Sequence, residues 1–397
     1  MPTWTGDAAR ARLALLGQFA LFGVLNVSWT SRLPSLVESL GINAAQLGQL
    51  LLIGGIGSLL GALSTGAVVT RIGARATLLL GIGGHVIGFG LLATSVFTGS
   101  VAVFIPGALI NGVSSAMSNI SINVSAAAVE QRIGRAIMPQ FHAMFSVGAA
   151  VGALTAAGFA RAGLGLDVQV VAVLTVATIA RLALTRPATA ITLGTARSTQ
   201  RGHATREALS AWREPRTLLL GLVLLAASLT EGAAGTWLPL AVVEGFAANE
   251  DVGALAYGSF VAAMTLVRAF GTRLIDRFGR VTVLRVSGVM ALVGLLLFVA
   301  GPSLALAWVG IILWGFGAAL GNPIATTAAA DDPLRASVRV SVVTSFSTVT
   351  ALAAPPLLGL LAASVGTRES LLVVGVFVVL SFVVSGAARR QEPVRQP

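Results

Sequence analysis

The sequence predicts an all-α membrane protein whose twelve transmembrane helices form two pseudo-symmetric six-helix bundles. Three observations lead to this prediction. Hydrophobic residues make up 55% of the 397 residues and charged residues only 10%, whereas a soluble domain carries about 25% charged residues. Twelve apolar runs follow one another, each near the roughly 20 residues that a spanning helix needs. One long polar segment divides the runs into six and six.

The apolar runs set the expected spans, and the polar segment between them is expected to be a linker. The first six spans are expected at 13–37, 44–69, 76–98, 101–128, 137–160 and 168–185. The second six are expected at 217–243, 252–272, 281–300, 304–330, 338–364 and 370–388. The resulting organisation is an N-terminal bundle at 1–185, a central linker at 186–216 and a C-terminal bundle at 217–397.

The arginines predict how the chain is oriented in the membrane. All 26 basic residues are arginine; 20 of them lie in the termini, the linker and the loops of one side, against only Arg161 and Arg368 on the other. Because cytoplasmic loops carry the basic excess, we expect both termini and the linker in the cytoplasm of a bacterial inner-membrane protein. No basic face exists, so no nucleic-acid partner is expected despite the net charge of +11. The absence of cysteine and the presence of only three histidines predict no metal site, and no cofactor is expected.

The two halves share short motifs at a nearly constant spacing. The repeated pairs are Leu33-Pro34 with Leu238-Pro239, Arg71-Ile-Gly73 with Arg277-Phe-Gly279, and Gly107, Gly112 and Asn119 with Gly310, Gly315 and Asn322. A parallel repeat of two six-span halves is typical of one transporter architecture, in which the substrate site lies between the halves near the bilayer midplane.

The loop after the second span in each half carries a recognisable motif. It reads Gly66-Ala-Val-Val-Thr70-Arg71-Ile-Gly73-Ala-Arg75 in the first half and Asp276-Arg277-Phe-Gly279-Arg280 in the second. Both resemble the G-x-x-x-D-R-x-G-R-R motif of the major facilitator superfamily, and the resemblance covers the whole chain. The resemblance implies the two-bundle fold of this superfamily and a monomeric protein. It also implies a gating role for the motif residues, which are Gly66, Arg71, Gly73, Arg75, Asp276, Arg277, Gly279 and Arg280. Thr70 replaces the motif acid in the first copy.

Two further motifs of drug–proton antiporters in this superfamily are incomplete. Ala108 stands at the position of their fourth-span Arg, and Ala153 stands where their fifth-span motif has Pro. The run from Phe141 to Gly148 is loosely similar to a bacterial fucose permease-like branch. The substrate class therefore stays open at this point.

Glu231 is the only carboxylate well inside a predicted span, about midway along the seventh. An ionisable group at that depth is a functional-site hypothesis by default. Desolvation disfavours the carboxylate, so this group is expected to load and release a proton as its exposure alternates. A protonated Glu that only bridges two helices is the alternative. His142 in the fifth span is the second proton-coupling candidate, with a helix–helix hydrogen bond as its alternative.

Polar and aromatic residues in the spans are candidates for substrate binding. Asn111, Ser115, Asn119 and Asn123 form a polar stripe along the fourth span, and a stripe of this kind must face protein or water. Asn322 occupies the position in the second half that corresponds to Asn119 in the first. Asn26 occupies the position in the first half that corresponds to Glu231. The remaining candidates are Trp29, Arg32, Trp237 and Trp314. For the tryptophans the alternative is packing or an interfacial belt, and for Arg32 it is an ion pair or a lipid headgroup.

These observations predict a transporter and not an enzyme. No P-loop is present, so protons rather than ATP are expected to drive alternating access. The aromatic residues and the single buried acid favour export of small amphipathic or drug-like molecules. The asparagine stripe favours the alternative, a proton symporter that imports a sugar or similar polar metabolite. A sensor or scaffold on a transporter fold is the alternative from another class.

Overall fold

The computed structural model describes residues 6–134, 137–191, 210–332 and 335–390. Every regular element in these ranges is a helix, so the predicted all-α class is confirmed. Within the described part of the chain, eleven helices are long and apolar enough to cross a bilayer. The longest, α3 (Ala44–Thr98), has 55 residues and contains two of the predicted spans.

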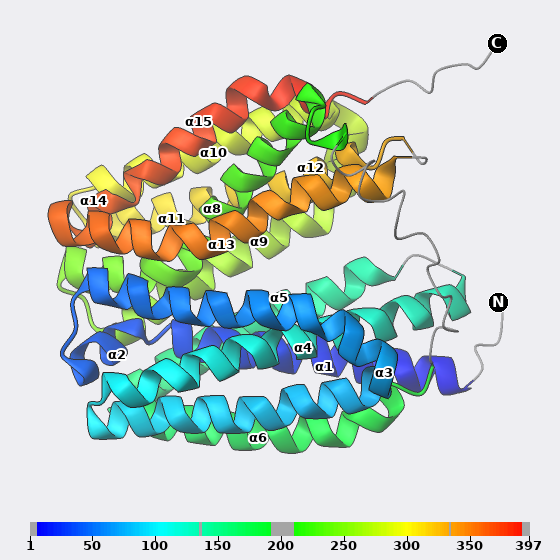
Figure 1. The fold of residues 1–397 in the computed structure, drawn as a ribbon. Coiled ribbons are helices and arrows are strands. Elements are labelled where there is room, and N and C mark those ends of the chain that lie inside the picture. The colour runs from blue at the N-terminus through cyan, green and yellow to red at the C-terminus, as the bar shows by residue number, and fades with distance from the viewer. Residues whose placement is uncertain (1–5, 135–136, 192–209, 333–334, 391–397) are drawn as a thin grey trace, which may run out of the picture. The chain divides into compact units, whose positions relative to one another are not determined.

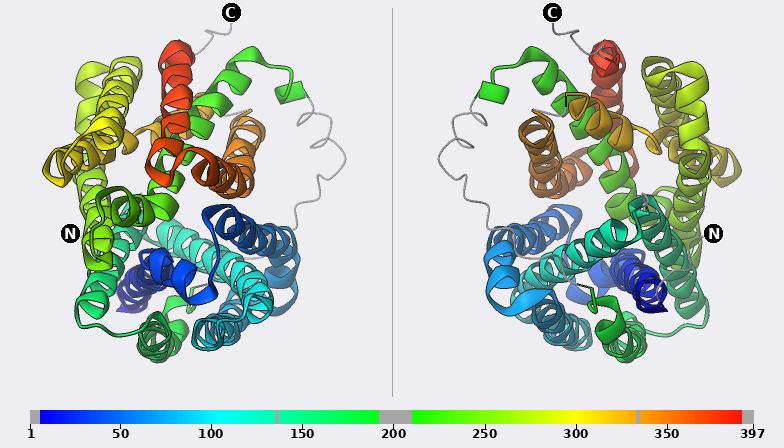
Figure 2. Two further views of the ribbon diagram at one scale, coloured as in Figure 1. Left: turned by 90° about the vertical axis from the view of Figure 1, so that its left-hand side faces the viewer. Right: turned by 90° about the vertical axis from the view of Figure 1, so that its right-hand side faces the viewer.

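The chain separates into two compact units, each a bundle of helices that run along a common direction (Figures 1 and 2). The first unit comprises Met1–Ala196 with Ala247–Gly258, and the second comprises Arg197–Phe246 with Ser259–Pro397. The first unit contains α1 (Gly6–Thr30), α2 (Leu33–Leu40), α3, α4 (Val101–Ile133), α5 (Met138–Arg161), α6 (Leu166–Ala188) and the start of α9 (Glu250–Phe278). The second contains α8 (Pro215–Phe246), the rest of α9, α10 (Arg280–Ala300), α11 (Leu304–Ala318), α12 (Gly321–Ala329), α13 (Ala336–Val365), α14 (Thr367–Ser370), α15 (Leu372–Val384) and η1 (Ser385–Ala388). Residues 192–209 of the predicted linker lie outside the described residues.

The two loop motifs turn the chain in the same way. Gly73 interrupts α3 with φ 83° and ψ 161°, and Gly279 separates α9 from α10 with φ 78° and ψ 155°. A side chain with a Cβ rarely adopts this backbone conformation, which explains why the motif needs glycine there. The space around both glycines is open, so it is backbone conformation and not close packing that requires them.

The internal repeat extends to helix contacts. A Cβ on Gly107 would lie 3.1 Å from the carbonyl oxygen of Gly88, and one on Gly310 would lie 2.5 Å from that of Gly294. Gly88 and Gly294 are 206 residues apart, the spacing that also relates the two loop motifs. Gly112 and Gly315 repeat the pattern against the carbonyls of Gly54 and Phe260, which are again 206 residues apart. Small residues thus bring equivalent backbones together in each unit.

Proline positions break some predicted spans and not others. The predicted first span, 13–37, is divided: α1 ends at Thr30, and α2 has Pro34 in its first turn, where a missing N–H costs nothing. The predicted tenth span is divided into α11 and α12 just before Pro323. Pro355 and Pro356, in contrast, do not interrupt the predicted eleventh span, and α13 runs through both. Spanning helices tolerate proline where the surrounding protein satisfies the freed backbone groups.

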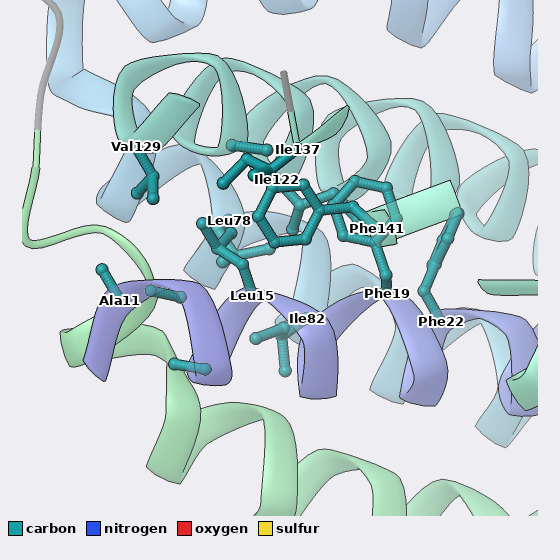
Figure 3. Close-up of a cluster of buried hydrophobic side chains, with 13 residues drawn as sticks. Ala11, Leu15, Phe19, Phe22, Leu78, Ile82, Ile122, Val129, Ile137 and Phe141 are labelled. Atoms are coloured by element: carbon teal, nitrogen blue, oxygen red, sulfur yellow. The ribbon is translucent and has the colours of Figure 1, made fainter. Parts of the chain in front are cut away.

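The core of the first unit forms around α1 (Figure 3). Phe19 of α1 stacks on Phe141 of α5, with ring centroids 5.5 Å apart. Leu78 and Ile82 of α3 and Ile122 of α4 complete the buried cluster. This packing holds α1 against three neighbouring helices, and α1 carries several of the predicted site residues.

Substitution of Gly148 is expected to disrupt the close contact between α1 and α5. A Cβ at Gly148 would clash with the Ala20 carbonyl oxygen, and a Cβ at Gly23 would lie only 2.8 Å from the Ala149 nitrogen. Gly148→Val is therefore expected to lower the free energy of unfolding by about 3 kcal/mol, measured by thermal unfolding of the purified protein in detergent. Gly158→Val, on an open face of the same helix, is the matched control. Equal losses in the two variants would contradict this packing.

Candidate functional site

Glu231 lies at the centre of a polar cluster in the second unit. Its Oε2 accepts a hydrogen bond from the Arg268 guanidinium of α9 at 2.9 Å and one from Asn322 Nδ2 of α12 at 3.0 Å. The Glu231 side chain is 33% exposed and that of Arg268 is 29% exposed. Glu231 is therefore not an isolated acid: it is half-buried and paired with a cation, which stabilises the carboxylate.

The break before Pro323 positions Arg268. Pro323 has no N–H, so the carbonyl of Ala319, four residues earlier, has no helical donor. Arg268 Nε donates to this carbonyl at 3.1 Å while its NH2 group holds Glu231. Asn322, next to the proline, donates to the same carboxylate oxygen. The sequence Asn322-Pro323 thus provides both a partner for Glu231 and an anchor for the guanidinium.

Hydroxyl groups connect this cluster to a cavity. Ser228 of α8 donates to Asn322 Oδ1 at 3.3 Å and lies 2.6 Å from Ser347 Oγ of α13. Both serines line a cavity of about 230 Å³ between α8 and α13, together with Thr236 and Thr350. Asn322 donates to Glu231 through its nitrogen and accepts from Ser228 through its oxygen. A change in the charge of Glu231 therefore alters the hydrogen bonding of Ser228 at the cavity wall.

The predicted stripe on α4 lies in the first unit and its members have different surroundings. Asn119 is exposed, and Asn123 Nδ2 donates to its side-chain oxygen at 2.8 Å. Ser115 is partly exposed and bonds to His85 of α3. Asn111 is buried, and its Oδ1 has no partner among the described residues.

Arg181 of α6 is a buried charge to which the sequence pattern assigned no role. It is 1% exposed, and its guanidinium contacts Gln18 of α1 and His85. His85 is therefore part of a polar network and not merely packed among aliphatic side chains. A charged residue inside a span requires a partner, and this rule could have directed attention to Arg181.

The candidates on α1 and just after it have their partners within the first unit. Asn26 Nδ2 donates to the Phe22 carbonyl of its own helix at 2.8 Å, and Trp29 packs edge-on against Phe89. Arg32 is 4% exposed and pairs with Glu250 at 2.7 Å, with further bonds to Gln169 and the Leu164 carbonyl. Of the alternatives for Arg32, the structure shows the ion pair.

The remaining tryptophans and His142 differ in exposure. Trp314 is fully buried against Phe260 and Phe298. Trp237 is equally buried from solvent, although it contributes to the lining of the hydroxyl-rich cavity. His142 is exposed and lies edge-on to Phe19.

The loop-motif residues lie at one end of each unit, and in the second unit they join a charge network. Gly66, Arg71, Arg75, Asp276 and Arg277 are exposed at that end. Asp331, after α12, accepts hydrogen bonds from Arg280 at 2.7 Å and from Arg216 at 2.8 Å. Burial raises the pKa of the Asp331 carboxyl, but hydrogen bonds from these arginines outweigh burial, so the pKa lies below its usual value.

Asp331→Asn is expected to destabilise the second unit by about 2 kcal/mol, because two partly buried arginines lose their acceptor. Since the folded-state pKa of Asp331 is lowered, the wild-type advantage should be complete above about pH 4 and disappear as the pH falls further. Thermal unfolding against pH measures both effects. Asp332→Asn, which alters the neighbouring and more exposed carboxylate, is the control and should cost less. A pH-independent difference between wild type and Asp331→Asn would contradict this assignment.

Comparison with known proteins decides the family. The sequence matches the Major Facilitator Superfamily over residues 14–337 and again over residues 220–397. The chain belongs to the major facilitator superfamily. An uncharacterised transporter of Sinorhizobium fredii, y4wD, is 32% identical over 380 residues, covering 95% of this chain and 96% of the relative. The membrane protein MosC of Rhizobium meliloti is 27% identical, with coverage of 96% and 91%. This superfamily member is thus a multi-pass membrane transporter and not an enzyme.

Solved structures of transporters share its fold. The nucleoside transporter NupG aligns with a TM-score of 0.70 at 16% identity, over 97% of this chain and 98% of NupG. The fucose transporter FucP in its outward conformation aligns with a TM-score of 0.67 at 13% identity, over 96% and 98% of the two chains. The D-xylose-proton symporter gives 0.68 at 14% identity, over 96% and 97%. At these identities the likeness concerns the fold of the superfamily.

Proposed function

We propose that this superfamily transporter is a proton-coupled secondary transporter of a small polar solute, working by alternating access, with Glu231 as the proton-carrying group. The observation that carries the proposal is the cluster of Glu231, Arg268 and Asn322 beside a hydroxyl-lined cavity. A partly exposed acid can reach water, and its partners change when it takes up a proton.

Protonation of Glu231 would alter the cluster in a defined order. The neutral acid no longer compensates Arg268, so the ion pair weakens and the guanidinium keeps only the Ala319 carbonyl. Asn322 then loses a charged acceptor and its bond with Ser228 is free to reorganise. Solute binding at the cavity wall and proton binding at Glu231 would thereby be linked.

A polar solute suits this geometry better than an amphipathic one. Export of amphipathic molecules would require aromatic walls that a solute can reach, and both Trp237 and Trp314 are buried from solvent in this structure. The cavity beside Glu231 carries Ser228, Thr236, Ser347 and other hydroxyl groups, which suit hydrogen-bonding ligands. Similar folds occur in a fucose:proton symporter and a D-xylose-proton symporter, and import by symport is the corresponding direction here. We place the transporter in the bacterial inner membrane, as a monomer with both termini in the cytoplasm.

Proteoliposomes test the proposal. Uptake of radiolabelled D-glucose, D-xylose, L-fucose, uridine and D-glucuronate would be measured with an imposed inward proton gradient. Accumulation of at least one of these solutes, abolished by a protonophore, is expected. Failure of all five to accumulate, or accumulation that persists without the gradient, would contradict proton-coupled transport of a polar solute.

A further inference from the structure

Arg181 carries an uncompensated charge inside the first unit. Its Nε donates to Gln18 Oε1 at 3.2 Å and its NH1 contacts His85 Nδ1 at 3.1 Å, but its NH2 has no partner among the described residues. The guanidinium also lies 5.8 Å from the centre of the Phe22 ring. These contacts are to neutral groups, so the positive charge is solvated but not neutralised.

Two other buried or half-buried arginines, Arg32 and Arg268, differ in this respect. Arg32 has a Glu250 oxygen at 2.7 Å and Arg268 has a Glu231 oxygen at 2.9 Å. Among the described residues no carboxylate forms an ion pair with Arg181. A buried cation without an acid is costly, so its retention calls for a negative partner that the protein itself does not provide.

The direction of the hydrogen bonds leads from Arg181 to Ser115. Arginine has no acceptor, so His85 Nδ1 must accept the hydrogen bond from Arg181. The ring proton of the neutral imidazole is therefore on Nε2, which lies 3.1 Å from Ser115 Oγ and donates to it. Ser115 then has its own hydroxyl hydrogen free to donate elsewhere. Because each bond in this chain is polarised by the charge behind it, that hydrogen is a stronger donor than an ordinary serine's.

Ser115 is also the member of the chain that can meet a solute. Arg181 and His85 are each 1% exposed, whereas Ser115 is partly exposed and Asn119, one turn further along α4, is exposed. The chain thus runs from a sealed charge to an accessible hydroxyl on the polar stripe.

We propose that Arg181, His85 and Ser115 form a charge-assisted donor chain that makes Ser115 a binding residue for an anionic oxygen of the solute, so that the transported class is an organic anion such as a carboxylate. Ser115 touches the solute, while Arg181 and His85 act through it as positioning residues. This inference rests on the proposed transport function and narrows its polar solute to an acid.

The absence of cysteine in the chain allows a direct measurement of the charge field at Ser115. In Ser115→Cys, the reaction rates of two methanethiosulfonate reagents would be compared, one bearing an ethylsulfonate and the other an ethyltrimethylammonium group. The sulfonate stands in for the anionic solute. The ratio of the two rates cancels the reactivity of the thiol itself. Asn123→Cys is the control, because it lies about 12 Å further along the same helix and outside the hydrogen-bonded chain from Arg181.

The proposal predicts a sulfonate-to-ammonium ratio about fivefold higher in Ser115→Cys than in Asn123→Cys. Adding Arg181→Gln should remove the difference, and adding Arg181→Lys should retain most of it. Equal ratios at the two positions, a ratio insensitive to Arg181→Gln, or no reaction of Ser115→Cys with either reagent would each overturn the proposal. If Arg181→Gln does not fold, the comparison of the two single-cysteine variants decides alone. If the wild type accumulates solute but the two cysteine variants give equal sulfonate-to-ammonium ratios, only this inference is refuted. If the ratios differ but the wild type does not accumulate solute, only the proposed proton coupling is refuted.

Discussion

Glu231→Gln is expected to abolish proton-driven accumulation of the solute while leaving exchange of solute across the membrane intact. Gln has the same shape and its carbonyl can still accept from Arg268 and Asn322, so the cluster can persist without a group that titrates. Accumulation in proteoliposomes should fall to the level of vesicles treated with a protonophore. Counterflow, which needs no proton gradient, should continue.

Glu244→Gln is the matched control for this substitution. Glu244 is a second acid at the far end of α8, hydrogen-bonded by Thr367. Its replacement should leave accumulation at the wild-type level. Undiminished accumulation in Glu231→Gln, or equal losses in both variants, would remove Glu231 from the coupling mechanism.

Arg268→Met is expected to lower the free energy of unfolding by about 2 kcal/mol, because it leaves a half-buried carboxylate without its cation. The double variant Glu231→Gln with Arg268→Met should recover most of this loss, since it removes both charges of the pair. Thermal unfolding of the wild type, the two single variants and the double variant forms a double-mutant cycle that isolates the interaction. Additive losses would show that the pair contributes nothing. Proton-driven accumulation should be absent from the double variant even where its stability is restored.

Much of the fold could be predicted because the bilayer imposes strong rules on sequence. Spanning helices must be apolar for about 20 residues, so existence and order of the spans follow from composition. The motif copies at Gly73 and Gly279 marked the repeat, and both glycines adopt the same left-handed conformation. Helix ends were less predictable. Pro34 and Pro323 break their spans while Pro355 and Pro356 do not, because surrounding packing decides whether the freed backbone groups find partners.

The candidate site could be predicted only in part. Glu231 stood out as a carboxylate in an apolar run, but its pairing with Arg268 joins helices 37 residues apart in sequence, which no local pattern specifies. One intramembrane acid and an arginine in the next span were nevertheless a sufficient signal to propose a pair. The chain from Arg181 to Ser115 joins α6, α3 and α4, and only tertiary packing brings these helices together.

Infrared difference spectroscopy of the purified transporter on addition of the transported solute tests most directly whether Glu231 carries the proton. The proposed coupling predicts that solute binding changes the carbonyl band of a carboxylic acid in the wild type and not in Glu231→Gln. The same change in both proteins, or no change in the wild type, would contradict it.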